Sequence, residues 1–270
     1  MKKTLALLAL SAASAGAFAQ FGTATSIWAG QVGQKATVPN SNPTESVTAY
    51  SNVTNFTGYG LAWGAADIGT AGIPSTWMDA DDLTVLGSEA GRDVMGFTFS
   101  SVNFNSTDST ASPTVAFWDG SSGAPGTLLG AVRFVPLTLS AGFVNLWSYD
   151  SATPLFTIPT SGKVYMGVSW DDFSDVAATG ISTADLGNLG QGLFDPPTVG
   201  SSPDSFFSSD NFGSNLVDNP AGATDYNFNG TPIANFGDEL RTADPVPEPA
   251  SLAVIGLGLA GLAARKRRKA

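Results

Sequence analysis

Short apolar runs separated by turn-forming residues are the feature that most constrains how this chain can fold. Between residues 20 and 245 these runs recur at a spacing of roughly ten residues and are bounded by Gly, Ser, Asn, Asp and Pro. No helical period of useful length interrupts them. The pattern predicts an all-β domain, an antiparallel sandwich or jelly roll. The expected strands are 46–56, 83–86, 94–102, 114–118, 127–134, 143–149, 155–158 and 163–170.

The clearest local unit is a hairpin. Two β-prone runs, 114–118 and 127–132, flank a loop from Asp119 to Gly126 that is dense in Gly, Ser and Pro. Such residues supply the positive or fixed φ angles that a hairpin loop needs. The unit also resembles a segment that recurs in bacterial exported β-sandwich domains, which supports the fold class and assigns no activity.

The pattern loosens over residues 180–245, where Pro and Gly breakers separate scattered aromatic residues. We expect long loops with one or two closing strands of the same domain. The alternative is a disordered acidic stalk.

The N-terminus has the pattern of a secretory signal peptide. A positively charged start precedes an apolar run over residues 5–10, and Ala17 and Ala19 form an A-x-A cleavage site. Cleavage by signal peptidase would leave Gln20 as the first residue of the mature chain. The two terminal segments are the only ones expected to be helical.

The C-terminus combines three features in a fixed order. A short motif comes first, an apolar run over 252–264 follows, and a basic cluster ends the chain. The motif is Val246, Pro247, Glu248 and Pro249, and the basic cluster is Arg265, Lys266, Arg267, Arg268 and Lys269. Thirteen helical residues reach about 20 Å, short of the roughly 30 Å hydrocarbon core, so the run makes a poor permanent anchor. Flanking cations stay cytoplasmic, which leaves the motif outside.

This tail resembles the PEP-CTERM protein-sorting domain of bacteria that export exopolysaccharide, and the resemblance is confined to residues 246–270. It implies recognition and cleavage near the Pro-Glu-Pro motif by an exosortase, a membrane enzyme of the envelope. The alternatives are an ordinary tail anchor or a buried C-terminal helix. The expected organisation is a signal peptide over 1–19, an exported domain over 20–245 and a sorting signal over 246–270.

The charge balance excludes one class of partner. Without the seven cations of the two terminal segments, 5 Lys and Arg remain against 23 carboxylates, a net charge of −18. Nucleic-acid binding needs clustered cations, so it is not expected. The chain has neither Cys nor His, which excludes Ser-His-Asp and Cys-His nucleophiles, the usual zinc sites and thiol redox centres.

Two groups of aspartates are candidate calcium ligands, because calcium prefers carboxylate and carbonyl oxygens. Asp171, Asp172 and Asp175 follow an expected strand, and a second group lies at residues 79–82. Neither has the spacing of an EF-hand loop. Solvated aspartates in turns are the alternative interpretation, and no other cofactor is expected.

Glycoside hydrolysis is the enzyme hypothesis that the composition leaves open, because it needs only two carboxylates. The glutamates of the mature chain are Glu45, Glu89, Glu239 and Glu248. Nothing in the sequence places two of them across a cleft, and we expect no enzyme.

Aromatic residues support a binding hypothesis, since sugar rings pack on Trp and Tyr faces. Strand alternation would turn Trp118 and Tyr165 away from the core, whereas Trp147 is ambiguous. The alternative is that these rings fill the core. The expected function is that of an exported, non-catalytic structural or adhesive protein of the envelope or matrix, associated with exopolysaccharide. A carbohydrate-binding module is the main rival and a glycan-active hydrolase a less favoured one.

Overall fold

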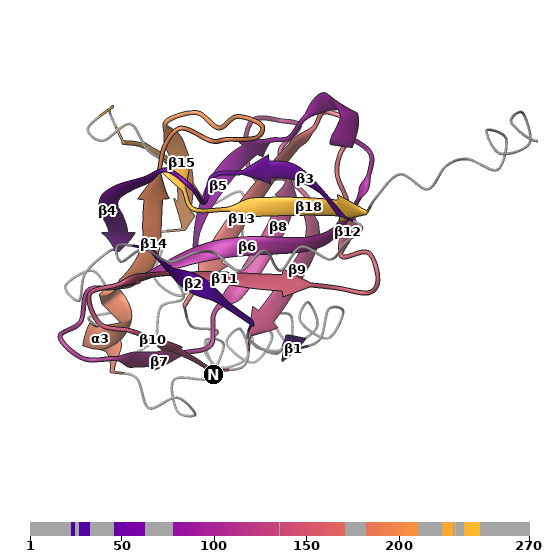
Figure 1. Ribbon diagram of the computed structural model, residues 1–270. Helices are drawn as coiled ribbons and strands as arrows, with labels where there is room; N and C mark the ends of the chain where they lie inside the picture. The colour runs from indigo at the N-terminus through magenta and orange to yellow at the C-terminus, as the bar shows by residue number, and fades with distance from the viewer. Residues whose placement is uncertain are drawn as a thin grey trace, which may run out of the picture.

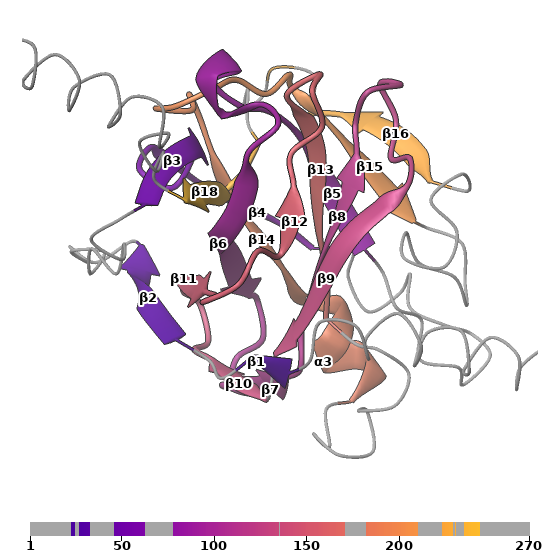
Figure 2. The ribbon, with the colours of Figure 1, turned by 90° about the vertical axis from the view of Figure 1, so that its right-hand side faces the viewer.

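The described part of the chain is almost entirely β structure. The computed structural model describes residues 23–24, 27–32, 46–62, 78–134, 136–170, 182–209, 223–228, 230 and 235–243. Its strands form two large sheets that face each other, which Figures 1 and 2 show from two sides. Every described pairing is antiparallel except that of β1 with β9. The all-β sandwich expected from the sequence is confirmed.

The first sheet has seven strands in the order β1-β9-β8-β13-β5-β15-β16. Their bounds are β1 (Thr23–Ala24), β9 (Leu128–Phe134), β8 (Thr114–Asp119), β13 (Lys163–Ser169), β5 (Met78–Thr84), β15 (Ser205–Ser209) and β16 (Thr224–Asn227).

The second sheet has nine strands, and its longest strand, β6 (Asp93–Asn103), pairs with four others. The remaining members are β2 (Ile27–Val32), β3 (Ser46–Ser51), β4 (Phe56–Ala62), β11 (Val144–Asp150), β12 (Phe156–Thr157), β14 (Leu189–Phe194), β17 (Asn235–Phe236) and β18 (Glu239–Ala243). A separate pair, β7 (Ser109–Ala111) with β10 (Leu137–Leu139), lies at one end. The described helices are η1 (Gly87–Glu89) and α3 (Thr183–Gly187), the latter capped by the Ser182 hydroxyl.

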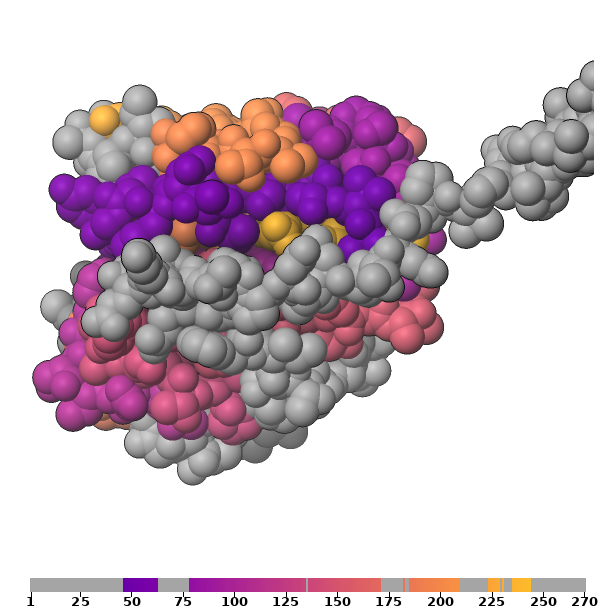
Figure 3. Space-filling view, in the orientation of Figure 1, coloured from indigo at the N-terminus to yellow at the C-terminus, as the bar shows by residue number. Residues whose placement is uncertain are grey.

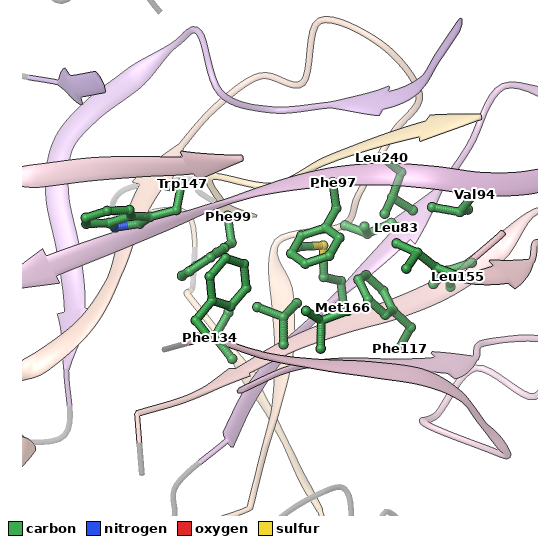
Figure 4. Close-up of a cluster of buried hydrophobic side chains, with 14 of the residues drawn as sticks. Leu83, Val94, Phe97, Phe99, Phe117, Phe134, Trp147, Leu155, Met166 and Leu240 are labelled. Atoms are coloured by element: carbon green, nitrogen blue, oxygen red, sulfur yellow. The ribbon is translucent and has the colours of Figure 1, made fainter. Parts of the chain in front are cut away.

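The main core lies between the two sheets. Period-two alternation sends Val115 and Phe117 of β8 into it, and Phe97 of β6 meets them from the opposite sheet (Figure 4). The Phe97 ring lies 5.2 Å from that of Phe117 and 6.0 Å from that of Phe134, both with edge-to-face geometry. Aromatic pairs of this kind add about 0.5–1.5 kcal/mol each beyond the area they bury.

The expected strands are all present, with shifted ends. The hairpin is confirmed: β8 pairs with β9, and the Asp119 amide donates to the Thr127 carbonyl at 2.9 Å across the loop. The largest boundary error concerns β5, which begins at Met78 rather than at Leu83. Its first residues include three aspartates, which strands normally disfavour, so local propensity concealed them.

The described residues between 182 and 243 are not a stalk. They supply α3 and five strands, of which β14, β17 and β18 belong to the second sheet and β15 and β16 to the first. The expectation of one or two closing strands therefore undercounted them.

The last described strand, β18, is built into the interior of the second sheet, where it pairs with both β3 and β6. In Figure 3 it reaches the surface only as a small yellow strip below the indigo band of residues 46–62. Arg241 at its centre is 1% exposed and donates to the Asp150 carboxylate at 2.8 Å and to Glu239 at 2.7 Å. The Thr98 hydroxyl and the Phe97 and Tyr149 carbonyls also accept from this guanidinium, so the buried cation is fully paired.

Candidate functional site

The aromatic residues expected to bind sugar are buried. Trp118 and Tyr165 do lie on the face of the first sheet opposite the main core, directly across from each other on β8 and β13. Trp118 is 0% exposed and Tyr165 3% exposed, however, and both pack with Met78 and Ala80 in a second apolar cluster. The prediction that both side chains point away from the main core is therefore correct, but the prediction that they form an exposed platform is wrong. The outer face of this sheet is itself buried, and strand alternation does not distinguish a buried outer face from an exposed one.

Trp147 is also buried, with 5% of its surface exposed. It belongs to the main core cluster (Figure 4), and its indole N–H donates to the Ser101 hydroxyl at 2.8 Å. Trp147 therefore offers no accessible ring for the glycan binding that the sequence predicted. The core alternative describes all three residues.

The two groups of aspartates have different outcomes. Asp171, Asp172 and Asp175 lie outside the described residues. Asp79 and Asp81 are on strand β5 with 6% and 0% exposure, so their interpretation as solvated turn residues is wrong.

Alternation along β5 directs Asp81 between the sheets. Met78 and Ala80 face the outer apolar cluster and Leu83 faces the main core, so Asp79 and Asp81 share the inward face with Leu83. Asp82 points the other way, opposite Tyr165 on β13.

The second sheet brings another buried carboxylate to the same space. Asp238 precedes β18 by one residue and is 0% exposed. Leu240, two residues later, faces the main core, so Asp238 also points inward. Tyr50 at the end of β3 and Asn52 just after it lie beside this segment. Tyr50 pairs with Leu240, and the backbone N–H of Asn52 donates to the Asp238 carbonyl at 2.8 Å.

Hydrogen bonds join the two sides of this space. Asp81 Oδ2 accepts from the Phe236 amide at 3.0 Å, and its Oδ1 accepts from the Ser202 hydroxyl at 2.9 Å. The backbone N–H of Asp238 donates to the Phe236 carbonyl at 3.0 Å, so Phe236 is bonded to the Asp81 carboxylate and to the Asp238 backbone. We call Tyr50, Asn52, Asp81, Ser202 and Asp238 the buried acidic cluster.

Burial dominates the electrostatics of this cluster. It raises the pKa of Asp81 and of Asp238 well above the ordinary aspartate value. The charge of Asp82 raises the pKa of Asp81 further, and the charge of Asp81 does the same for Asp238. The pKa of the Tyr50 phenol is raised by burial and then by the charges of Asp81 and Asp238. Asp82, only partly buried, has its pKa raised to about 7 by desolvation, against the lowering effects of Ser202 and Lys163.

The cluster lacks a described cation. Within the resolved strands and loops, Arg92 pairs with Glu89 and Arg241 pairs with Asp150 and Glu239, and no ion pair reaches Asp81 or Asp238. Neither oxygen of Asp238 accepts a hydrogen bond there. Among the same residues, no group of three acidic side chains converges closely enough to hold a metal ion.

Of the four glutamates of the hydrolase hypothesis, the structure describes two, and both are in ion pairs with arginines. Glu89 is 3% exposed, pairs with Arg92 at 2.8 Å and accepts from the Thr242 hydroxyl. Glu239 pairs with Arg241, whereas Glu45 and Glu248 fall outside the described part of the chain.

Sequence reasoning missed Asp238 because a single aspartate after Gly237 looks like an ordinary turn residue.

Comparison with known proteins identifies the tail. Residues 245–268 match the model of the PEP-CTERM protein-sorting motif. The chain carries a PEP-CTERM sorting signal. No curated protein and no solved structure matches the chain. Within the described residues, no helix has the length and hydrophobicity to cross a membrane.

A PEP-CTERM signal marks an exported protein that is recognised by an exosortase and processed at the membrane. Here the signal follows the folded domain almost directly, because β18 ends at Ala243 and the match begins at residue 245. The end of β18 is held in place: the Arg92 guanidinium donates to the Ala243 carbonyl, and the Thr242 hydroxyl donates to Glu89. Ala243, the last described residue before the PEP-CTERM match, is therefore held on the second sheet.

Proposed function

We propose that the exported protein is a non-catalytic structural or adhesive element of the outer envelope or extracellular matrix, associated with exopolysaccharide. Signal peptidase would remove residues 1–19, and the apolar run over 252–264 would hold the chain in the inner membrane until an exosortase cleaves near Pro-Glu-Pro. The molecule that remains is the β-sandwich.

The observation that carries this proposal is the short distance in sequence between the last described strand of an all-β domain, which ends at Ala243, and the sorting signal, which begins at residue 245. The last described strand, β18, is paired on both sides, so a load applied at the C-terminus would act on the interior of a sheet. A domain of this kind suits a load-bearing or displayed element. The strong negative charge of residues 20–245 would keep neighbouring copies apart.

Cell fractionation tests the sorting half of the proposal. Deleting residues 246–270 is expected to release the protein into the medium, because both the retention segment and the cleavage motif are lost. Replacing Pro247, Glu248 and Pro249 by Ala is expected to leave a full-length form in the membrane fraction. Release of this alanine variant in processed form would contradict the proposal.

Carbohydrate binding remains the second candidate, and its support is now a different pair of rings. Tyr59 on β4 and Phe104 after β6 are 61% and 52% exposed. Each offers an accessible face that sugar could cover, at about 25 cal/mol per Å² of apolar surface.

Retention on the host's own exopolysaccharide tests this candidate. If these rings bind sugar, Tyr59→Ala and Phe104→Ala should each weaken retention with little change in thermal midpoint. Leu86→Ala is the matched control, because Leu86 is exposed to 42% and has no ring. Equal retention of all four proteins would leave the purely structural proposal.

A further inference from the structure

The buried acidic cluster holds two carboxyl groups with no described cation beside them. The buried guanidinium of Arg241 on β18, by contrast, forms ion pairs with two carboxylates and donates to three neutral acceptors. Asp81 and Asp238 are both 0% exposed, and no Lys or Arg of the described segments pairs with either. Buried carboxylates are normally paired, protonated or bound to a metal ion, because desolvating an isolated charge costs several kcal/mol.

Unsatisfied oxygen atoms point to a ligand rather than to a protonated pair alone. Both carboxylate oxygens of Asp238 are buried and accept no hydrogen bond from a described residue. The amide oxygen of Asn52 is in the same condition, although its Nδ2 donates to the Phe194 and Phe236 carbonyls at 2.9 and 3.1 Å. The Tyr50 hydroxyl, in the same cluster, is also buried without a partner among the described residues. Most buried polar atoms have partners, so four unpartnered oxygen atoms in one cluster require an explanation.

The orientation of Asn52 is fixed by those two donations. Its Nδ2 is held by two carbonyls of the second sheet, so Oδ1 is the atom left for a ligand. The backbone of Asp238 is fixed as well, because its carbonyl accepts from the backbone N–H of Asn52 and its own N–H donates to the Phe236 carbonyl. Rigidly placed oxygen atoms are what a cation site needs, since little conformational entropy is then lost on binding.

We propose that Asp81 and Asp238, with the side-chain oxygen of Asn52, bind a calcium ion between the two sheets.

The chemistry of the oxygen atoms selects the metal. Cys and His are absent from the chain, so soft and borderline metals have no preferred ligands. Two carboxylates balance one divalent charge. Magnesium sheds its water reluctantly and demands octahedral geometry, whereas calcium accepts six to eight oxygens in irregular arrangements, with carbonyls and water completing the set.

The affinity should be modest, because only two ligands are charged and no group of three acidic side chains in the described chain is placed to hold an ion. Calcium modules of the extracellular medium have dissociation constants of about 10⁻⁴–10⁻³ M, and we expect a value in that range. Binding would lock β5 of the first sheet to the start of β18 in the second.

Calcium titration of the full chain, purified in mild detergent and stripped with a chelator, tests the proposal. Isothermal calorimetry should give one calcium ion per chain, and the thermal midpoint should rise with calcium concentration. Asp238→Asn should weaken binding at least tenfold and abolish the rise. Asp108→Asn, at an exposed aspartate, is the matched control and should behave as the wild type.

Two further measurements keep the test decisive. Asp238→Asn removes an unpaired buried charge, so in chelator its midpoint should equal or exceed that of the wild type; Asp81→Asn is the second variant should the first fail to fold. Absence of any calcium effect on the wild type up to about 10 mM, tenfold above the expected range, overturns the proposal. So does a calcium effect that survives both variants and disappears only when Asp171, Asp172 and Asp175 are replaced by Asn.

Discussion

Truncation of Trp118 separates a core role from a binding role. The ring is fully buried, packs with Tyr165 and Met78, and lies so close to the Gly167 backbone that a Cβ there would be 3.0 Å from Trp118 Cζ3. Replacing a buried Trp by Ala typically costs about 3–5 kcal/mol. For a domain of this size each kcal/mol corresponds to about 2–4 °C, so Trp118→Ala should lower the midpoint by about 6–20 °C.

Thermal and urea unfolding of the wild type and of two variants measures this effect. Phe104→Ala is the control, because its ring is 52% exposed and its loss should cost under about 1 kcal/mol. A fall of less than about 2 °C for Trp118→Ala would refute the buried position of the ring and return Trp118 to the list of accessible aromatics.

Three other outcomes follow from the same structure. Arg241→Met should cost about 3–5 kcal/mol in urea unfolding, since it leaves two carboxylates without their cation, whereas Lys163→Met at an exposed position should be near neutral. Far-UV circular dichroism of residues 20–245 should show β structure with helix below about a fifth of the residues. In chelator the midpoint should fall as pH rises from about 4 to about 7, because burial raises the folded-state pKa of Asp82 to about 7 and the folded state then holds its proton longer than the unfolded state does. Asp82→Asn should reduce this slope, and the part that remains is expected from Asp81 and Asp238, whose pKa values are also raised by burial. A midpoint that rises over that range would contradict the assignment.

The sequence predicted the strands whose residues are apolar and β-branched. Val115 and Phe117 of β8 and Val164 and Met166 of β13 alternate as expected, because one face of each strand meets a continuous core. Strand β14, with its Gly and Gln residues, carries no such signal, and its position depends on pairing with β4 and β6. Long-range pairing of this kind overrides local propensity.

The buried acidic cluster also depends on long-range contacts that the local sequence does not predict. The aspartates of β5 were visible as a group, but a hydrophilic run of this kind predicts a turn. Only the partnership of Asp81 with residues 236–238, more than 150 positions away, turns them inward. Nothing local to Asp238 indicates that β18 will place it opposite β5. By contrast, the PEP-CTERM signal was predictable in full, because an exosortase recognises a linear segment whose features are contiguous.

Intact-mass spectrometry of the mature protein, isolated from cells with an active exosortase, tests the central claim most directly. The account predicts a single species that begins at Gln20 and has lost the residues after the Pro-Glu-Pro motif, including Arg265 to Ala270. Recovery of the protein with Arg265 to Ala270 still attached would contradict it.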